Sequence, residues 1–76
     1  MITVDQLRQC AWLSSIHIEA LLQKKKHKET VLAADFVGIS NGGQFVYTVA
    51  LPEGEQIRKA KVFVWQDSNG DVVADF

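Results

Sequence analysis

The chain of 76 residues lacks most of the features that would assign it to a function class. Its single cysteine, Cys10, excludes an internal disulfide. The formal net charge of −1 gives no whole-chain reason to bind nucleic acid or an anionic membrane. No run approaches the ~20 apolar residues of a membrane span, and the first residues have neither the basic start nor the apolar core of a secretory signal. We therefore expect a cytoplasmic protein without a membrane anchor.

Motifs for catalysis, cofactors and metals are missing as well. No glycine-rich phosphate loop is present, and one cysteine with two histidines ten residues apart is not a zinc ligand set. Cys10, Ser14 and His17 share one stripe of a predicted helix, but Cys10 and His17 would lie about 10 Å apart along its axis, too far for a nucleophile and its base. Asp67-x-Asn69-Gly70-Asp71 resembles part of a calcium loop without its final glutamate, and fits a turn better. We expect no catalytic residues, cofactor, metal or small-molecule substrate.

What the chain does contain is the composition of an ordinary folded protein. Apolar residues make up 47% of it and charged residues 22%, which argues against disorder. Its length predicts one domain over residues 1–76. A domain of this size buries only about 60% of its unfolded surface, so we expect modest stability.

The first 28 residues have a helical pattern. Thr3 and Gln6 fit a capping box at the start of a helix. Apolar or small residues then recur at spacings of three and four up to about Lys26, which places them on one stripe. Ser14-Ser15 interrupts this stripe, and serine favours helix caps over helix interiors. We therefore predict a kink or a break into two helices at this point.

From residue 29 onward the pattern is that of strands. The predicted strands are Thr30–Ser40, Gln44–Leu51, Ala60–Gln66 and Asp71–Phe76. Asn41-Gly42-Gly43 and Asp67–Gly70 are turn signals, whereas Pro52-Glu53-Gly54 is a predicted breaker, followed by one helical turn at Glu55–Lys59. The predicted fold is α+β: a helical region, 1–28, packs on a four-stranded antiparallel sheet, 29–76, made of two hairpins.

The turns predict which strand residues face each other. A two-residue turn at Asn41-Gly42 pairs Ile39 with Gln44, Val37 with Val46, and Phe36 with Tyr47, and sets Phe45 across from Gly38. For the second hairpin two registers remain open. A two-residue turn pairs Trp65 with Ala74, whereas a three-residue loop with a glycine bulge pairs Trp65 with Val73 and Val64 with Ala74.

The strand at Ala60–Gln66 is apolar on both faces. Val62 and Val64 point one way, and Phe63 and Trp65 point the other. One helical region covers one face of a small sheet, so the other face needs a partner, unless the sheet curls and covers itself. An uncovered face of several hundred Å² usually marks an interaction surface. The candidate contacts on the face away from the helix are Val37, Val46, Val62, Val64 and Val73.

The leading functional hypothesis is therefore a non-enzymatic protein-interaction module, either a homodimer or an adaptor or inhibitor of a larger protein. The alternative is a small nucleic-acid-binding protein. It would use the basic run Lys24, Lys25, Lys26 and Lys28 for phosphate, with Lys61, Phe63 and Trp65 as a stacking surface. Residues 1–28 carry five basic and two acidic residues, or +3, whereas residues 29–76 carry three and seven, or −4.

Overall fold

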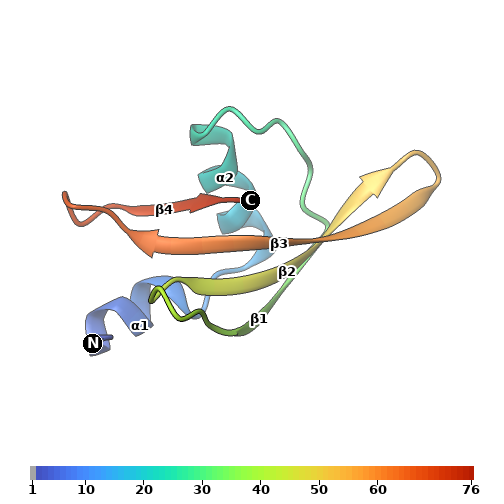
Figure 1. The fold of residues 1–76 in the computed structure, drawn as a ribbon. Helices are drawn as coiled ribbons and strands as arrows, with labels where there is room; N and C mark the ends of the chain where they lie inside the picture. The colour runs from blue at the N-terminus through green and yellow to red at the C-terminus, as the bar shows by residue number, and fades with distance from the viewer. Residues whose placement is uncertain (1) are drawn as a thin grey trace.

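Two helices and a four-stranded antiparallel sheet make up residues 2–76, the part of the chain that the computed structural model describes. The elements are α1 (Val4–Cys10), α2 (Ser15–Lys24), β1 (Ala33–Ile39), β2 (Phe45–Glu53), β3 (Gln56–Gln66) and β4 (Val72–Asp75). The strands lie in chain order, β1-β2-β3-β4, and both helices lie behind the sheet in Figure 1. This arrangement confirms the predicted α+β fold.

The helical region is broken where the serines predict. Thr3 Oγ1 accepts the Gln6 N–H at 3.1 Å, and the Gln6 side chain accepts the Thr3 N–H at 2.9 Å, so the predicted capping box opens α1. α1 ends at Cys10, and Ser14 caps α2 with a second box, in which His17 fills the position of the usual glutamate or glutamine. The break shortens both helices enough to fit on the sheet.

The end of α2 is a Schellman motif. Lys26 has a left-handed backbone with φ of +66°. The His27 N–H donates to the Leu22 carbonyl at 3.0 Å, and the Lys26 N–H donates to the Gln23 carbonyl at 2.9 Å. These bonds satisfy carbonyls that the helix end would otherwise leave unpaired, and they turn the chain back toward the sheet.

The predicted break and helical turn between the two hairpins are wrong. β2 and β3 instead form one long hairpin that projects from the body of the protein (Figure 1), with Glu53 and Gln56 as its last pair. Gly54, with φ of +63°, makes the tight turn. Pro52 is tolerated inside β2 because its nitrogen faces the side on which β1 has already ended, so no hydrogen bond is lost.

The registers of the other two hairpins follow the predictions only in part. Phe36 pairs with Tyr47 as expected, but a β-bulge between Phe36 and Gly38 then shifts the strand. Ile39 therefore pairs with Phe45 and Gly38 with Val46, so the expected pairs Ile39–Gln44, Val37–Val46 and Phe45–Gly38 are wrong.

In the second hairpin Trp65 pairs with Val73 and Val64 with Ala74, which selects the alternative with the longer loop and the glycine bulge. Gly70 takes the left-handed conformation with φ of +83°, and its N–H donates to the Asp67 carbonyl at 3.0 Å. This register places Ala74 on the side of the sheet that faces the helices, where a small residue fits beneath α2.

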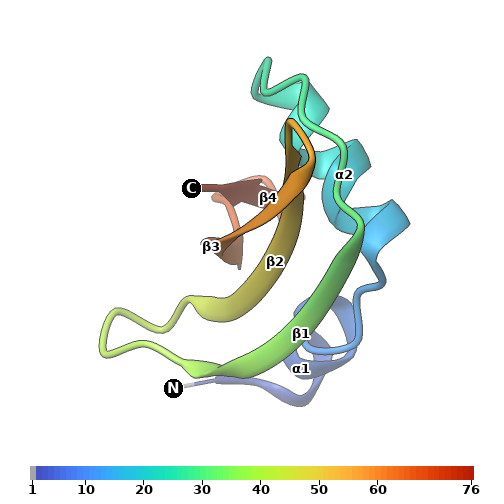
Figure 2. The ribbon, with the colours of Figure 1, turned by 90° about the vertical axis from the view of Figure 1, so that its right-hand side faces the viewer.

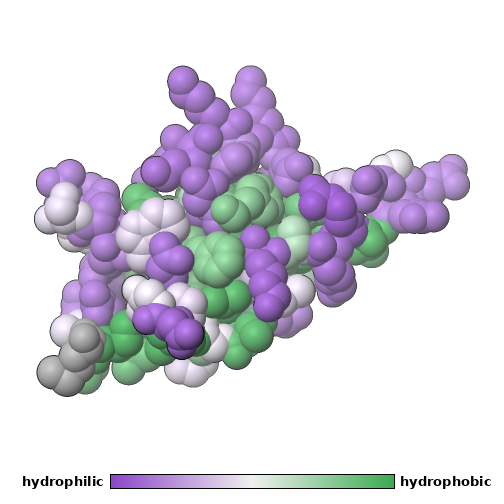
Figure 3. All heavy atoms as spheres, viewed as in Figure 1, coloured by the Kyte–Doolittle hydropathy of each residue, from purple (hydrophilic) through white to green (hydrophobic). Residues whose placement is uncertain are grey.

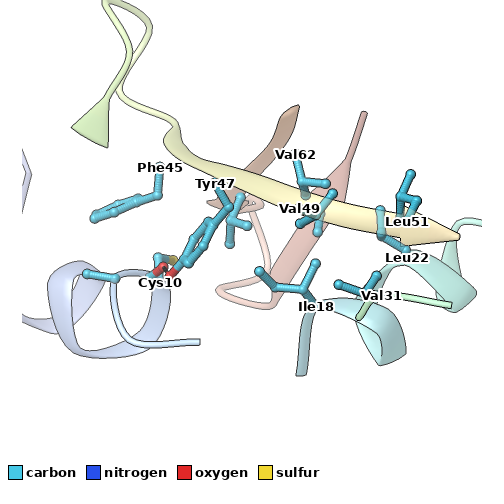
Figure 4. Close-up of a cluster of buried hydrophobic side chains, with 12 residues drawn as sticks. Cys10, Ile18, Leu22, Val31, Phe45, Tyr47, Val49, Leu51 and Val62 are labelled. Atoms are coloured by element: carbon cyan, nitrogen blue, oxygen red, sulfur yellow. Dashed lines mark hydrogen bonds between the residues drawn. The ribbon is translucent and has the colours of Figure 1, made fainter. Parts of the chain in front are cut away.

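The core lies between the helices and one face of the sheet (Figure 4). Its most deeply buried side chains are Cys10, Ile18, Leu22, Phe45, Tyr47, Val49, Leu51, Val62, Val64 and Ala74. Tyr47 has a second role. Its hydroxyl donates to the Cys10 carbonyl and accepts the Leu13 N–H at 3.1 Å, so one side chain of the sheet holds the α1–α2 turn.

A polar contact joins the end of the helical region to β4. His27 Nε2 lies 2.7 Å from Asp75 Oδ1, and the His27 ring packs edge-on against Phe76. The hydrogen bond from His27, with a second from the Phe76 N–H, lowers the pKa of the Asp75 carboxyl.

This contact predicts a pH dependence of stability. The pKa of Asp75 is lower in the folded state than in the unfolded state. Asp75 therefore makes its full contribution to folding stability above its unfolded pKa of about 3.9, and this contribution is lost as the pH falls through its folded pKa. We expect Asp75→Asn to be less stable than the wild type at pH 7, with the difference shrinking toward pH 3. Urea unfolding at pH 7 and at pH 3 measures this difference in stability. Asp71→Asn, the same change at an exposed position, is the control. A difference that stays constant across this range would contradict the assignment.

Candidate interaction site on the open sheet face

The sheet face turned away from the helices is uncovered, and we call it the open face. Register places Val46 beside Phe63 and Trp65 beside Val73 on this face. We call these four residues the open-face cluster. Figure 3, which looks onto the open face, shows hydrophobic surface over the middle of the sheet with polar side chains around it.

The structure places the five predicted interface valines in different environments. Val46 and Val73 lie on the open face and are half-buried, and Val37 is 56% exposed at the bulge of β1. Val62 and Val64 are 0% exposed and face the helices, so their assignment to the open face is wrong. They pair with Tyr47 and Phe45, and directly paired residues point to the same side of a sheet.

The aromatic side of β3 is consequently the open side. Phe63 and Trp65, which the predicted orientation of Val62 and Val64 would have turned toward the helices, are half-buried on the open face although no helix covers them. Figure 2 shows the reason: the sheet curves away from the helices, so the open face lies on the inner side of the curve. The curved sheet therefore partly covers its own open face, which was the predicted alternative to a covering partner. It does not close over the open-face cluster.

Positive charge lies on the same face of β3. Alternate residues of β3 point to the same side, so one stripe on the open face contains Ile57, Lys59, Lys61, Phe63 and Trp65. Within residues 2–76 the acidic side chains close to a basic one are Asp75, beside His27, and Glu29 and Glu53, beside Arg58, so neither lysine of the stripe has an acidic partner. The stripe thus presents two free cations beside two aromatic rings.

A cavity of about 330 Å³ lies beside Trp65 at the other end of the stripe. Its lining comes from the start of the chain, the β1–β2 loop and the ends of β2 and β3: Ile2, Gln6, Gly42, Gly43, Gln44, Phe45, Trp65 and Gln66. No charged side chain lines it, and of its lining residues Trp65 belongs to the open-face cluster, whereas Phe45 belongs to the core.

The basic run lies on a different element from the aromatic rings. Lys24 ends α2, and Lys25, Lys26 and Lys28 follow it, all exposed. His27 within the run is held by Asp75. The lysines thus surround the end of α2, where positive charge opposes the negative end of the helix dipole. That the basic run and the aromatic rings of β3 bind the same nucleic acid stays a prediction.

The candidate nucleophiles are used structurally. Cys10 is fully buried, and burial, with a smaller contribution from the Asp5 charge, raises the pKa of its thiol, which is therefore protonated at neutral pH. Ser14 Oγ lies 2.9 Å from His17 Nδ1, but both groups also bond to each other's backbone N–H as a helix cap. Cys10 does not join them.

The Asp67–Asp71 segment is a turn, as predicted. Asp67 Oδ1 accepts the backbone N–H groups of Asn69 and Asp71 at 2.9 and 3.0 Å, which uses the oxygen that would otherwise face an ion. Across residues 2–76 the structure contains no group of three or more histidine, cysteine, aspartate or glutamate side chains that could hold a metal.

The sequence analysis missed the most exposed apolar residues of the protein. Trp12 is 81% exposed in the α1–α2 turn, and Ile16 is 78% exposed in the first turn of α2. In one continuous helix up to Lys26, Ile16 would widen the buried stripe. The break before α2 turns this residue outward, and a single continuous periodicity cannot show that change.

No helix within the described residues is long and apolar enough to cross a membrane. Comparisons of the chain with protein-family models, with curated proteins and with solved structures find no match, so the site is interpreted from its own geometry.

Proposed function

We propose that this protein is a non-enzymatic protein-interaction module whose open face receives a structural element of another protein, as an adaptor or an inhibitor. The observation that carries the proposal is an apolar sheet face, centred on Phe63 and Trp65, that no helix of the described chain covers. Aromatic side chains at the centre of a surface supply much of the binding energy of protein interfaces.

The curvature of the sheet favours a convex partner. Interfaces pack with close shape complementarity, and two concave faces from two copies of the chain meet only at their rims. A single helix of about 10 Å diameter fits along the inner side of a curved sheet. Of the two versions of this function, an adaptor or inhibitor is therefore favoured over a homodimer formed through the open face.

Fluorescence of Trp65 tests the proposal. In a Trp12→Phe background Trp65 is the sole tryptophan. The probe is an 18-residue helical peptide of leucine and glutamate with its leucines on one stripe. We expect its addition to shift the Trp65 emission to shorter wavelength, because binding removes water from the ring, and we expect Phe63→Ser to weaken binding at least tenfold, since a central aromatic contact contributes about 2 kcal/mol or more.

Ile57→Ser is the matched control, because Ile57 lies on the same face of β3 but in the projecting hairpin, away from the open-face cluster. It should bind the peptide as the wild type does. An unchanged emission spectrum, or equal losses in both variants, would contradict the proposal. Sedimentation at micromolar concentration provides a separate check: a dimer that Phe63→Ser dissociates would assign the open face to a second copy instead.

Nucleic-acid binding is the second candidate, because Lys59 and Lys61 precede Phe63 and Trp65 on one exposed stripe. Cations beside aromatic rings bind single strands by charge and stacking. Against it, Asp35 is exposed on the same face, across Thr48 from Lys61, and the chain is acidic beyond residue 28. Addition of a thymidylate dodecamer at low salt decides between the two candidates. Quenching of Trp65 fluorescence that falls steeply with added salt would favour nucleic-acid binding over a protein partner.

A further inference from the structure

A small groove lies on the opposite side of the molecule from the open face, between the two helices and β4. It is lined by Gln9, Leu13, His17, Ala20, Leu21, Lys24 and Val72. Its floor is apolar, formed by Leu13, Leu21 and Val72, which pack against the edge of the core. None of these residues belongs to the open-face cluster, so the groove is a separate feature.

The size of the groove limits what it can hold. Its volume is about 200 Å³, below the roughly 300–1,000 Å³ of sites that enclose a small-molecule ligand. A space of this size fits one large apolar side chain. Protein interfaces commonly use such pockets to take a single anchoring side chain from the partner.

The charge around the groove is positive. Lys24 lines its rim, and no acidic residue is among its lining residues. Of the two acids of the helical region, Glu19 accepts the Val31 N–H at 2.7 Å, whereas Asp5 lies next to the groove, because it accepts a hydrogen bond from the lining residue Gln9 at 3.4 Å. Asp71 is exposed and precedes the lining residue Val72, so one carboxylate also lies near this end of the groove.

Two further observations extend this surface. Lys25, Lys26 and Lys28 continue the positive charge beyond Lys24, and the helical region carries +3 in total, from five basic and two acidic residues. Trp12 and Ile16, 81% and 78% exposed, flank Leu13 and His17 along the chain. Both residues leave a large apolar side chain of the helical region exposed to water, although neither lines the groove.

We propose that this groove is a second docking site, which takes one large apolar side chain from an acidic segment of a partner protein. The apolar floor binds the side chain, and Lys24 with the following lysines binds the flanking carboxylates. Charge complementarity with the lysines selects an acidic partner, and the apolar lining selects a protein over a nucleic acid. The site does not depend on the open face, and together the two would let the module join two partners.

Short peptides and methyl NMR of the full chain test this inference. The probe is a capped five-residue peptide with phenylalanine between two pairs of glutamates. We expect it to shift the methyl signals of Leu13, Leu21 and Val72 and to leave the ring signals of Phe63 unchanged. Lys24→Glu should weaken the binding at least fivefold, whereas Lys59→Glu, the same change on the open face, should leave it unaltered.

Matched probes decide between the possible outcomes. Equal binding of the peptide with lysines in place of the glutamates would overturn the role of charge, and equal binding of the peptide with serine in place of phenylalanine would overturn the role of the groove. A duplex oligonucleotide that shifts the same methyl signals more strongly would assign the surface to nucleic acid and overturn the proposal. None of these results bears on the open face, because Trp65 emission is measured separately.

Discussion

Tyr47→Phe is expected to lower the free energy of unfolding by about 2–4 kcal/mol, although it removes a single oxygen atom. The Tyr47 hydroxyl donates to the Cys10 carbonyl and accepts the Leu13 N–H, and its partners lie in the turn between α1 and α2. Without the hydroxyl both backbone groups lose their partner in a partly or fully buried setting, and each unsatisfied group costs about 1–3 kcal/mol. Burial also raises the pKa of the Tyr47 phenol, so it is a neutral donor at physiological pH.

Urea and thermal unfolding measure this effect. For a domain of this size each kcal/mol shifts Tm by about 4–8 °C, so we expect Tm to fall by more than about 8 °C. Thr48→Val is the control, because it removes a hydroxyl from the neighbouring residue of β2 on the open face and should change stability little. A loss of less than 1 kcal/mol for Tyr47→Phe would show that the turn does not depend on this hydroxyl.

The predictions that held rest on local chemistry. The capping box of Thr3 and Gln6, the break before Ser15 and the Asp67–Gly70 turn each depend on residues within four positions of one another, and all three form. The α+β fold followed because these local signals fix the type of nearly every element. Local signals did mislead at Pro52 and Gly54, where a tight hairpin uses the residues that usually break a strand.

The predictions that failed required knowledge of packing. A strand that is apolar on both sides has the same period-two pattern whichever side is buried, so nothing within β3 separates Val62 and Val64 from Phe63 and Trp65. Their pairing with Tyr47 and Phe45 on β2 decides it. The bulge at Val37 likewise shifts the register of β1 without a residue pattern that announces it.

For the candidate site, the sequence predicted that an uncovered face exists but not which residues form it. Val46 could be assigned to the open face because alternation sets it opposite Phe45 and Tyr47, whereas the face of Val73 depended on a register that stayed open, and that of Phe63 and Trp65 on packing. The groove beside Lys24 was beyond prediction, because it depends on how α1, α2 and β4 come together.

Val62→Asp is expected to unfold the protein at neutral pH. Val62 is 0% exposed between Tyr47 of β2 and the helices. A carboxylate there must either lose its hydration or become protonated, and a pKa shift of 3–5 units costs about 4–7 kcal/mol. A 76-residue domain has about 4–11 kcal/mol of stability in total at 0.05–0.15 kcal/mol per residue, so this one substitution removes most or all of it.

Val73→Asp is the matched control for Val62→Asp, because it places the same charge on the open face, where the side chain reaches water. We expect it to fold, to lose about 1 kcal/mol or less, and to weaken binding of the leucine–glutamate peptide to the open-face cluster by charge repulsion and lost apolar contact. Circular dichroism and amide NMR spectra of the two variants report folding directly. A folded Val62→Asp beside an unfolded Val73→Asp would reverse the two faces of the sheet, and the interaction surface would then contain Val62 and Val64 after all.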